Sequence, residues 1–295
     1  MKQKGTYSIK DLEQFSGIKA HTIRIWEVRY GLLKPSRTDT NIRYYDDEQL
    51  KRLLNISYLI KNGLKVSKIS LMDSNELYDI LTSFYNGQEK DQSTDDKINN
   101  LVVAMIDLNE DLFETVFSSA VRHLGFENAV TKVIYPFLDK VGLLWTMGNI
   151  QPAQEHFISN LIRQKIIVAI DKQSIFKNPI SKFLLFLPEG EMHEIGLLLA
   201  NYMIREKGNQ TIYLGQNVPL EDVLQVCDTY APNYIFSYIT IPRAEEELKS
   251  FFDKLSNSVK KGKVLVSGNL PEISFKLPAN LKRVTSIKDL AKILE

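Results

Sequence analysis

Residues 182–196 read KFLLFLPEGEMHEIG, and this stretch decides how the second half of the chain is interpreted. The apolar run KFLLFL has the length and composition of a buried strand. His193 follows at the C-terminal end of this strand, with carboxylates on both sides and Gly196 shortly after it. From this stretch alone, His193 could be a general base, a zinc ligand, a structural residue, or the ligand of a metal that a cofactor carries.

The C-terminal part of the chain alternates between strands and helices. Strands are predicted at 182–187, 211–215, 234–239, 263–268 and 283–287, and helices near 192–207, 220–228, 243–260 and 287–294. Such alternation is typical of a doubly wound parallel sheet, which binds ligands at the C-terminal ends of its strands. Residues 179–295 are therefore expected to form a Rossmann-like domain with His193 at its ligand-binding edge.

The middle of the chain is predicted to be helical. Apolar residues recur at three- and four-residue spacing in the segments 101–109, 112–125, 129–145 and 153–173. Because the connections are short, a four-helix bundle is expected over 99–178. The stretch before it is mostly polar, so residues 76–98 are expected to be a linker.

Residues 1–75 are expected to form a basic head of short helices and a hairpin. Helices are predicted over 10–15, 19–30 and from Asp46 or Asp47 to about 62, with a hairpin or wing at PSRTDTNIRYY (35–45). The first 70 residues carry 14 Lys+Arg against 7 Asp+Glu, whereas the other 225 carry 23 against 29. A basic head on an acidic body suggests that the head alone binds a polyanion.

The side chains that could contact DNA lie on the second helix and on the wing. The helix is long enough to enter a major groove, and the wing can reach phosphates. The candidates are Lys19, His21, Arg24 and Arg29 on the helix and Arg37, Arg43, Tyr44 and Tyr45 on the wing. Ile23, Ile25 and Trp26 are expected to pack inward. From charge alone, a solvated basic domain that does not bind DNA is equally compatible.

The order of residues in the head resembles the MerR family of winged helix-turn-helix regulators. The matching segments are YSI (7–9), SGI (16–18), TIRxWExRYGLL (22–33), Pro35, Arg37 and RxY (43–45). The resemblance implies a dimer that binds a near-palindromic double-stranded operator. The Arg-x-Trp-Glu form resembles the branch of the family that carries a cobalamin module.

A catalytic or zinc-binding role for His193 has no partner motif in the sequence. The other histidines are His21, His123 and His156, and no Ser-His-Asp order, nucleophile elbow or HExxH motif is present. The single cysteine, Cys227, excludes an intrachain disulfide and a cysteine-rich zinc site, and it is expected to be a packing residue. A structural role for His193 stays open on these grounds.

The spacing around His193 resembles the Asp-x-His-x-x-Gly motif of cobalamin-binding Rossmann domains, with Glu191 in the aspartate position. The resemblance implies that His193 replaces the cofactor's dimethylbenzimidazole as the lower cobalt ligand, while Glu191 holds its other ring nitrogen. A carboxylate in this position fixes the tautomer of a ligating histidine. Gly196 would let the backbone approach the nucleotide tail.

Two later segments resemble further elements of the same family. Ser237-x-Ile239 corresponds to its Ser-x-Leu element, and Ser267-Gly268 corresponds to its Gly-Gly pair. The resemblance implies that Ser237, Ser267 and Gly268 contribute to the cofactor site. Ser267 departs from the pattern, because only the second glycine of the pair is present.

The bundle resembles the domain that covers the upper face of adenosylcobalamin in the CarH/LitR group of photoreceptor regulators. The match is Trp145, followed by Glu155-His156. Taken alone, these residues would be better explained as bundle core and an exposed helix pair. In photoreceptors that form a bis-histidine adduct, a histidine follows the tryptophan. Here Thr146 follows it, so a light response in that form is not supported.

These observations predict a multidomain α and α/β protein: a winged helix-turn-helix, a four-helix bundle and a Rossmann-like sheet. The expected function is a cytoplasmic transcriptional repressor, not an enzyme, that binds adenosylcobalamin and a DNA operator as a dimer or tetramer. Cleavage of the cobalt–carbon bond by light, or loss of the cofactor, is expected to release the DNA. No signal peptide or membrane span is evident. The alternatives are a MerR-type repressor with a vestigial cobalamin fold that responds to a protein partner, or a corrinoid-dependent enzyme component.

Overall fold

The computed structural model describes residues 6–73, 76–77, 79–81, 83, 93–146, 150–174, 178–259 and 262–294. The chain divides into two units, residues 1–161 and 162–295, and the division falls inside helix α10 (Pro152–Asp171). Each unit has fully buried apolar residues of its own, such as Phe113 in the first and Phe252 in the second. In the described part of the chain, no helix has the length and apolar character needed to cross a bilayer.

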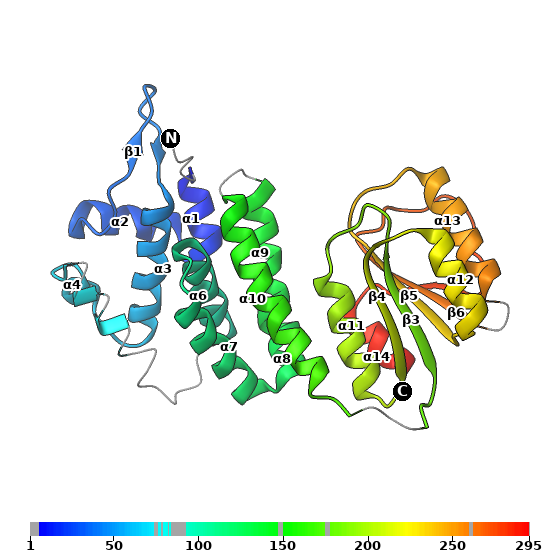
Figure 1. The fold of residues 1–295 in the computed structure, drawn as a ribbon. Helices are drawn as coiled ribbons and strands as arrows, with labels where there is room; N and C mark the ends of the chain where they lie inside the picture. The colour runs from blue at the N-terminus through cyan, green and yellow to red at the C-terminus, as the bar shows by residue number, and fades with distance from the viewer. Residues whose placement is uncertain are drawn as a thin grey trace. The chain divides into compact units, whose positions relative to one another are not determined.

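The N-terminal part of the first unit is a winged helix-turn-helix (Figure 1). Ser8 caps its first helix, because the Ser8 hydroxyl accepts the Asp11 N–H at 3.3 Å and the Asp11 carboxylate accepts the Ser8 N–H at 2.6 Å. Gly17 and Gly31 end the first two helices in the left-handed conformation. An antiparallel hairpin follows them and forms the wing. The elements are α1 (Ile9–Ser16), α2 (Ala20–Tyr30), β1 (Ser36–Arg37), β2 (Arg43–Tyr44), α3 (Asp47–Lys61) and α4 (Val66–Ile69).

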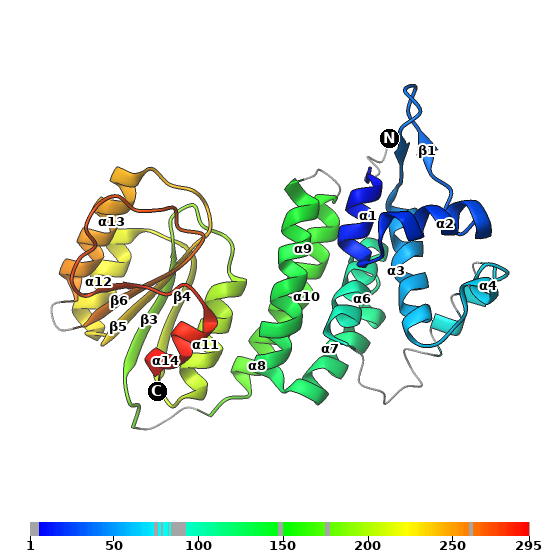
Figure 2. The same cartoon turned by 180° about the vertical axis from the view of Figure 1, so that it is seen from behind.

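The helices that follow run side by side in both ribbon views (Figures 1 and 2). Gln154, in the first turn of α10, donates a hydrogen bond from Nε2 to the Ile106 carbonyl at 3.1 Å and so fastens α10 to α6. This arrangement agrees with the predicted bundle of helices. The elements are α6 (Thr94–Asp107), α7 (Glu110–Leu124), α8 (Phe126–Ala129), α9 (Tyr135–Thr146) and α10.

The first bundle helix begins earlier than the apolar pattern predicted. Ser93 caps α6, because its hydroxyl accepts the Asp96 N–H at 3.2 Å, and so the helix starts at Thr94. Of the linker predicted over 76–98, residues 84–92 lie outside the described part of the chain.

The third bundle helix is not the regular helix over 129–145 that was predicted. It starts at Phe126 and contains a π-helical turn over Val130–Ile134. Pro136 lies just after this turn. Proline has no N–H, and its ring crowds the carbonyl four residues earlier, so a widened turn relieves the contact.

The second unit is built on a parallel sheet of five strands in the order β4-β3-β5-β6-β7. Helices α11 and α14 cover one face, and α12 and α13 cover the other (Figures 1 and 2). The prediction of a doubly wound, Rossmann-like sheet is confirmed. The elements are β3 (Lys182–Pro188), α11 (Ile195–Glu206), β4 (Gln210–Val218), α12 (Leu220–Tyr230), β5 (Tyr234–Ile239), α13 (Glu245–Ser258), β6 (Lys263–Gly268), β7 (Leu281–Arg283) and α14 (Ile287–Leu294).

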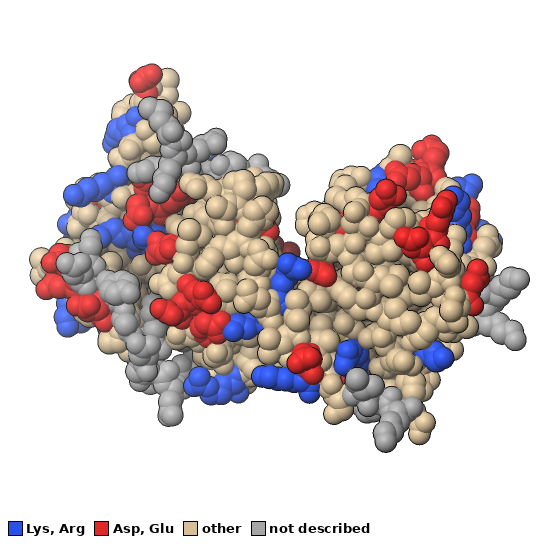
Figure 3. All heavy atoms as spheres, viewed as in Figure 1, with Lys and Arg blue, Asp and Glu red and all other residues tan. Residues whose placement is uncertain are grey.

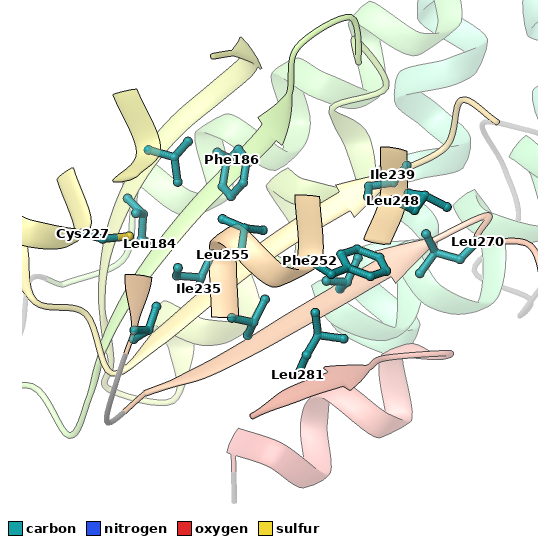
Figure 4. Packing of buried hydrophobic residues seen from close by; sticks show 14 residues of the cluster. Leu184, Phe186, Cys227, Ile235, Ile239, Leu248, Phe252, Leu255, Leu270 and Leu281 are labelled. Carbon is teal, nitrogen blue, oxygen red and sulfur yellow. The ribbon is translucent and has the colours of Figure 1, made fainter. Parts of the chain in front are cut away.

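A close-packed core fills the space between the sheet and helices α12 and α13 (Figure 4). Phe186 and Ile235 reach it from β3 and β5, and Phe252 reaches it from α13. Each fully buried side chain of this size contributes about 1.5–3 kcal/mol. Cys227 is 3% exposed in the same core, so the expectation that it is a packing residue is confirmed.

The last strand lies earlier than the predicted 283–287. Val284 donates one further backbone hydrogen bond to Val266 at 2.8 Å, after which the chain turns into α14. The Ser286 hydroxyl accepts the Asp289 N–H at 3.2 Å, and Thr285 donates its hydroxyl proton to the Asp289 carboxylate at 2.5 Å. Thr285 and Ser286, which the sequence pattern assigned to a strand, therefore cap α14 instead.

The strand order places the point where the chain changes direction across the sheet at the C-terminal end of β3. Because β4 and β5 lie on opposite sides of β3, the connections that leave the sheet there diverge. The register pairs Phe186 of β3 with Ser237 of β5. The loops that follow the two strands, 189–194 and 240–244, therefore lie at one edge of the sheet.

Candidate functional site

A fully buried carboxylate organises the loop after β3. Glu191 is 0% exposed, and its Oε1 accepts the N–H groups of Met192 at 3.1 Å and His193 at 3.0 Å. Its Oε2 accepts the N–H groups of Thr240 at 2.6 Å and Ile241 at 2.8 Å. One side chain thus ties the loop after β3 to the end of β5.

Glu191 stays ionised in this setting. Burial by itself raises its pKa, but the N–H groups of Ile241, Thr240 and His193 and the His193 side chain together hold the pKa of Glu191 below its usual value. A carboxylate that receives several N–H donors is better stabilised as an anion than as an acid.

The imidazole of His193 is oriented by this carboxylate. Nδ1 lies 2.5 Å from Glu191 Oε1, and the His193 side chain is 61% exposed. An ionised carboxylate can only accept a hydrogen bond, so we assign the proton to Nδ1. Nε2 then keeps its lone pair, which is the form in which a histidine ligates a metal.

Glu194, the residue after His193, is also held by several hydrogen bonds. Arg163 of α10 donates from Nε at 2.9 Å and from Nη2 at 2.6 Å to Oε2 of Glu194, which is 8% exposed. Tyr213 of β4 donates its hydroxyl proton to the other oxygen of Glu194 at 2.8 Å. Burial, and then the contact with Glu194, raise the pKa of Tyr213 above its ordinary value. The sequence did not reveal this group, because its members are joined only by the tertiary fold.

Gly196 contacts β5 through Tyr238, and the side chain of the neighbouring Ser237 points to the opposite face of the sheet. A Cβ atom on Gly196 would lie 2.6 Å from the Tyr238 ring, so α11 and β5 approach each other closely at the glycine. Ser237, beside Tyr238 in β5, is 0% exposed. Its hydroxyl has no hydrogen-bond partner among the described residues. A buried hydroxyl without a partner is uncommon and is compatible with a ligand contact.

Ser267 and Gly268 have roles within the fold itself. Ser267 donates its hydroxyl proton to the Val284 carbonyl at 2.8 Å. Gly268 has φ +108°, and a Cβ atom there would lie 2.0 Å from the Ile239 carbonyl oxygen. Only glycine therefore allows β6 to approach β5 so closely at this point.

In the first unit, the residues of the bundle signature lie at helix ends. Trp145 lies in the last turn of α9 and is 50% exposed, so it is not a core residue. Glu155 and His156 lie near the start of α10, where Glu155 Oε2 is 2.8 Å from His156 Nδ1. The His156 side chain is 72% exposed. The side chain of Thr146 lies outside the described part of the structure.

Basic side chains gather over α2 and the wing on the face drawn in Figure 3. Arg29 lies over the Tyr30 ring at 5.3 Å, and Arg37 donates from Nη1 to Asn41 Oδ1 at 2.6 Å. The exposed members of the predicted DNA-contacting set are Lys19, His21, Arg24, Arg29 and Arg37, whereas Arg43 and Tyr44 are partly buried.

Two expectations about the head are corrected. Tyr45 is 1% exposed, its backbone pairs with that of Tyr7, and its hydroxyl donates to Glu27, so it is a core residue that cannot reach a phosphate. Ile25 was expected to pack inward but is 50% exposed, whereas Ile23 and Trp26 are 0% and 8% exposed. Residues two apart on a helix cannot share one face.

Known protein families match two separate parts of the chain. The family described as MerR HTH family regulatory protein matches residues 7–76, which contain the winged helix-turn-helix. The family described as B12 binding domain matches residues 97–169, which contain Trp145, Glu155 and His156.

Several curated proteins are similar to the chain. The HTH-type transcriptional repressor CarH of Myxococcus xanthus is 26% identical over 261 residues, or 87% of this chain and 86% of CarH. The HTH-type transcriptional repressor CarA of the same organism is 26% identical over 266 residues, or 89% of this chain and 86% of CarA. The HTH-type transcriptional regulator MlrA of Escherichia coli (strain K12) is 39% identical over 83 residues, or 28% of this chain and 34% of MlrA.

The fold also resembles a solved structure, that of the Methanosarcina barkeri monomethylamine corrinoid protein. The TM-score is 0.57 at 17% sequence identity, and the match covers 68% of this chain and 98% of that protein. This similarity shows a shared fold. The named relatives CarH and CarA are transcriptional regulators rather than enzymes. The chain therefore carries a MerR-type helix-turn-helix over residues 7–76 and a B12-binding domain over residues 97–169, and over most of its length it is similar to the repressors CarH and CarA.

Proposed function

We propose that the chain is a cobalamin-dependent repressor in which His193 is the lower cobalt ligand and adenosylcobalamin is the bound form. The observation that carries the proposal is the pair of Glu191 and His193. A fully buried carboxylate holds Nδ1 at 2.5 Å, and the imidazole, 61% exposed, keeps Nε2 for a metal. A carboxylate behind a ligating histidine is the usual support of a metal site.

The residues around His193 fit a corrinoid at the cobalt end of the site. The unpartnered hydroxyl of Ser237 offers a hydrogen bond to a ligand group that reaches β5. At the other end, the Tyr238 ring occupies the space beside Gly196. The proposal therefore requires this ring to shift when the nucleotide tail binds.

The proposal assigns Trp145, Glu155 and His156 to the upper face of the cofactor. Adenosylcobalamin, when bound, supplies a cobalt–carbon bond that light can cleave. Trp145 offers an apolar surface to the adenosyl group because the residue is 50% exposed. The paired Glu155 and His156 offer polar contacts beside it. Ser267 and Gly268 complete the assigned set at the end of β6.

DNA binding is assigned to the head. Exposed arginine, lysine and histidine side chains on α2 and the wing provide contacts to a double-stranded operator. A homo-oligomer, dimer or tetramer, would present several heads together, and their joint binding raises operator affinity. Cofactor binding shifts the chain toward that assembly, and loss of the cofactor releases the operator.

The visible absorption spectrum tests this proposal directly. Purified protein is mixed with adenosylcobalamin in darkness, desalted, and measured before and after illumination. Retained colour with a spectrum that His193→Ala alters, and that His21→Ala on the DNA-binding head leaves unchanged, is the expected result. Operator binding is then compared with and without cofactor, in darkness and in light. Equal operator binding in all four conditions would contradict the proposed switch.

A second candidate function is a repressor that responds to a protein partner through a cobalamin fold that no longer binds cobalamin. The Tyr238 ring beside Gly196 and the serine at position 267 favour it. A protein that is colourless after desalting, yet binds its operator, would support this candidate.

A further inference from the structure

The exposed face of α2 has an apolar centre. Val28 is 82% exposed and Ile25 is 50% exposed, whereas Ile23 and Trp26, on the opposite face, are buried. Successive residues of a helix are rotated by about 100°. On this geometry Val28 is about 140° from Ile23 and about 160° from Trp26, so it lies opposite the midpoint of the two buried residues and near the middle of the surface that α2 presents to solvent.

Charged side chains flank this apolar centre on both sides. Arg24 lies along one edge of the exposed face and Arg29 along the other, and both are exposed. The Arg29 guanidinium is 5.3 Å from the centre of the Tyr30 ring, which holds it beside the helix rather than over Val28. The face therefore has a positive edge, an apolar strip formed by Ile25 and Val28, and a second positive edge. His21, which is also exposed, continues the strip toward the start of the helix, because it lies seven residues before Val28.

This pattern is complementary to the major groove of DNA. The two edges of the groove are lined by phosphates, which arginines bind, while the floor displays the C5-methyl group of every thymine. An apolar side chain at the centre of a recognition helix has no other apolar group to contact on that floor.

Resting on the proposed DNA-binding function, we infer that Val28 and Ile25 select thymine in the operator by contacting its methyl group. Arg24 and Arg29 bind the DNA on either side of this contact. Each methyl group removed from water on binding changes affinity by about four-fold. Because an oligomer engages more than one half-site, the effect is multiplied in the full operator.

Deoxyuracil replaces thymine without changing pairing or charge, so it isolates the methyl group. The operator is first selected from a random DNA pool with the full chain and adenosylcobalamin in darkness, and with the full chain alone. Each thymine of the selected site is then replaced by deoxyuracil. The wild type is expected to lose about four-fold in affinity for each contacted methyl. Val28→Ala is expected to lose this difference at the thymine that Val28 contacts.

Leu71→Ala is the matched control, because Leu71 is an apolar residue that is 85% exposed and lies outside α2. It is expected to keep the full dependence on the thymine methyl groups. Wild-type protein that binds thymine and deoxyuracil operators equally would overturn the inference alone. The inference would also be overturned if Val28→Ala changed the oligomeric state in analytical ultracentrifugation and the variant still discriminated the two DNA forms. Failure to select any DNA sequence would instead defeat the proposed DNA-binding function itself.

Discussion

Replacing Glu191 by glutamine tests whether the carboxylate prepares His193 for cobalt. The substitution keeps the size of the side chain and removes its charge. The His193 imidazole would then lose the anion that fixes its proton on Nδ1 at 2.5 Å. Loss of such a supporting carboxylate typically lowers metal affinity by about 10–100-fold, which corresponds to about 1.4–2.8 kcal/mol.

The same substitution has a local cost in stability. Glu191 accepts two backbone N–H groups on each oxygen, from Met192 and His193 on one and from Thr240 and Ile241 on the other. In either orientation, the glutamine amide would turn its own N–H groups toward two of these donors. At about 1–3 kcal/mol for each buried donor left without a partner, the loop would lose about 2–6 kcal/mol.

Both effects can be measured on the full chain. Titration with cobalamin, followed by visible absorption, gives the affinity, and hydrogen exchange read by mass spectrometry gives the local opening of the segment around Thr240. Glu247→Gln is the matched control, because Glu247 forms an ion pair with Arg243 at 2.9 Å but its side chain is 57% exposed. A Glu191→Gln protein with wild-type affinity and spectrum would refute the assigned role of the carboxylate.

Three further predictions follow from the second unit and the bundle. Arg163→Ala removes the two donors that Arg163 gives to Oε2 of Glu194. Since the Arg163 side chain is 36% exposed, the expected loss is about 1–3 kcal/mol, seen as faster hydrogen exchange over residues 189–196. Gly268→Ala is expected to destabilise the second unit by about 3 kcal/mol or more in thermal unfolding, because the alanine Cβ would lie 2.0 Å from the Ile239 carbonyl oxygen. Gly142→Ala is the control: no atom lies within 4 Å of the position of its Cβ, so this substitution should be neutral or stabilising. Burial raises the pKa of the Cys227 thiol, so iodoacetamide should modify it more slowly in native than in denatured protein at pH 8. Above the ordinary pKa of a thiol, the unfolded chain loses the Cys227 proton while the folded chain keeps it. The free energy of unfolding therefore decreases as the pH rises above that ordinary pKa.

Much of the fold could be predicted because it depends on local patterns. The apolar run at 182–187 and the alternation after it identified the sheet, and the boundaries of β5 and β6 match the structure. The spacing of Glu191 and His193 identified the pair that the structure joins. In each case the residues lie close in sequence, so spacing alone brings them together.

The predictions from sequence were wrong or incomplete where tertiary contacts or unusual helical geometry determine the position of a residue. Arg163, Glu194 and Tyr213 lie on a helix, a loop and a strand that are far apart in the sequence. No local sequence pattern therefore predicts that they form one group. Tyr45 is buried because the wing folds back onto α1 and α2, which its sequence neighbours do not reveal. Ile25 is different, since counting residues along α2 would have placed it on the exposed face.

The two hydrogen bonds that Glu191 accepts from the end of β5 also set an order of events during folding. They join residues 49 and 50 positions apart in the chain, across a parallel pair of strands. Parallel pairing over such a separation forms slowly, because the intervening chain must be closed into a loop first. His193 therefore acquires its fixed orientation only after β5 has joined β3. A ribosome must therefore have released the chain through the end of β5, three of the five strands, before His193 can take up a cofactor in this orientation.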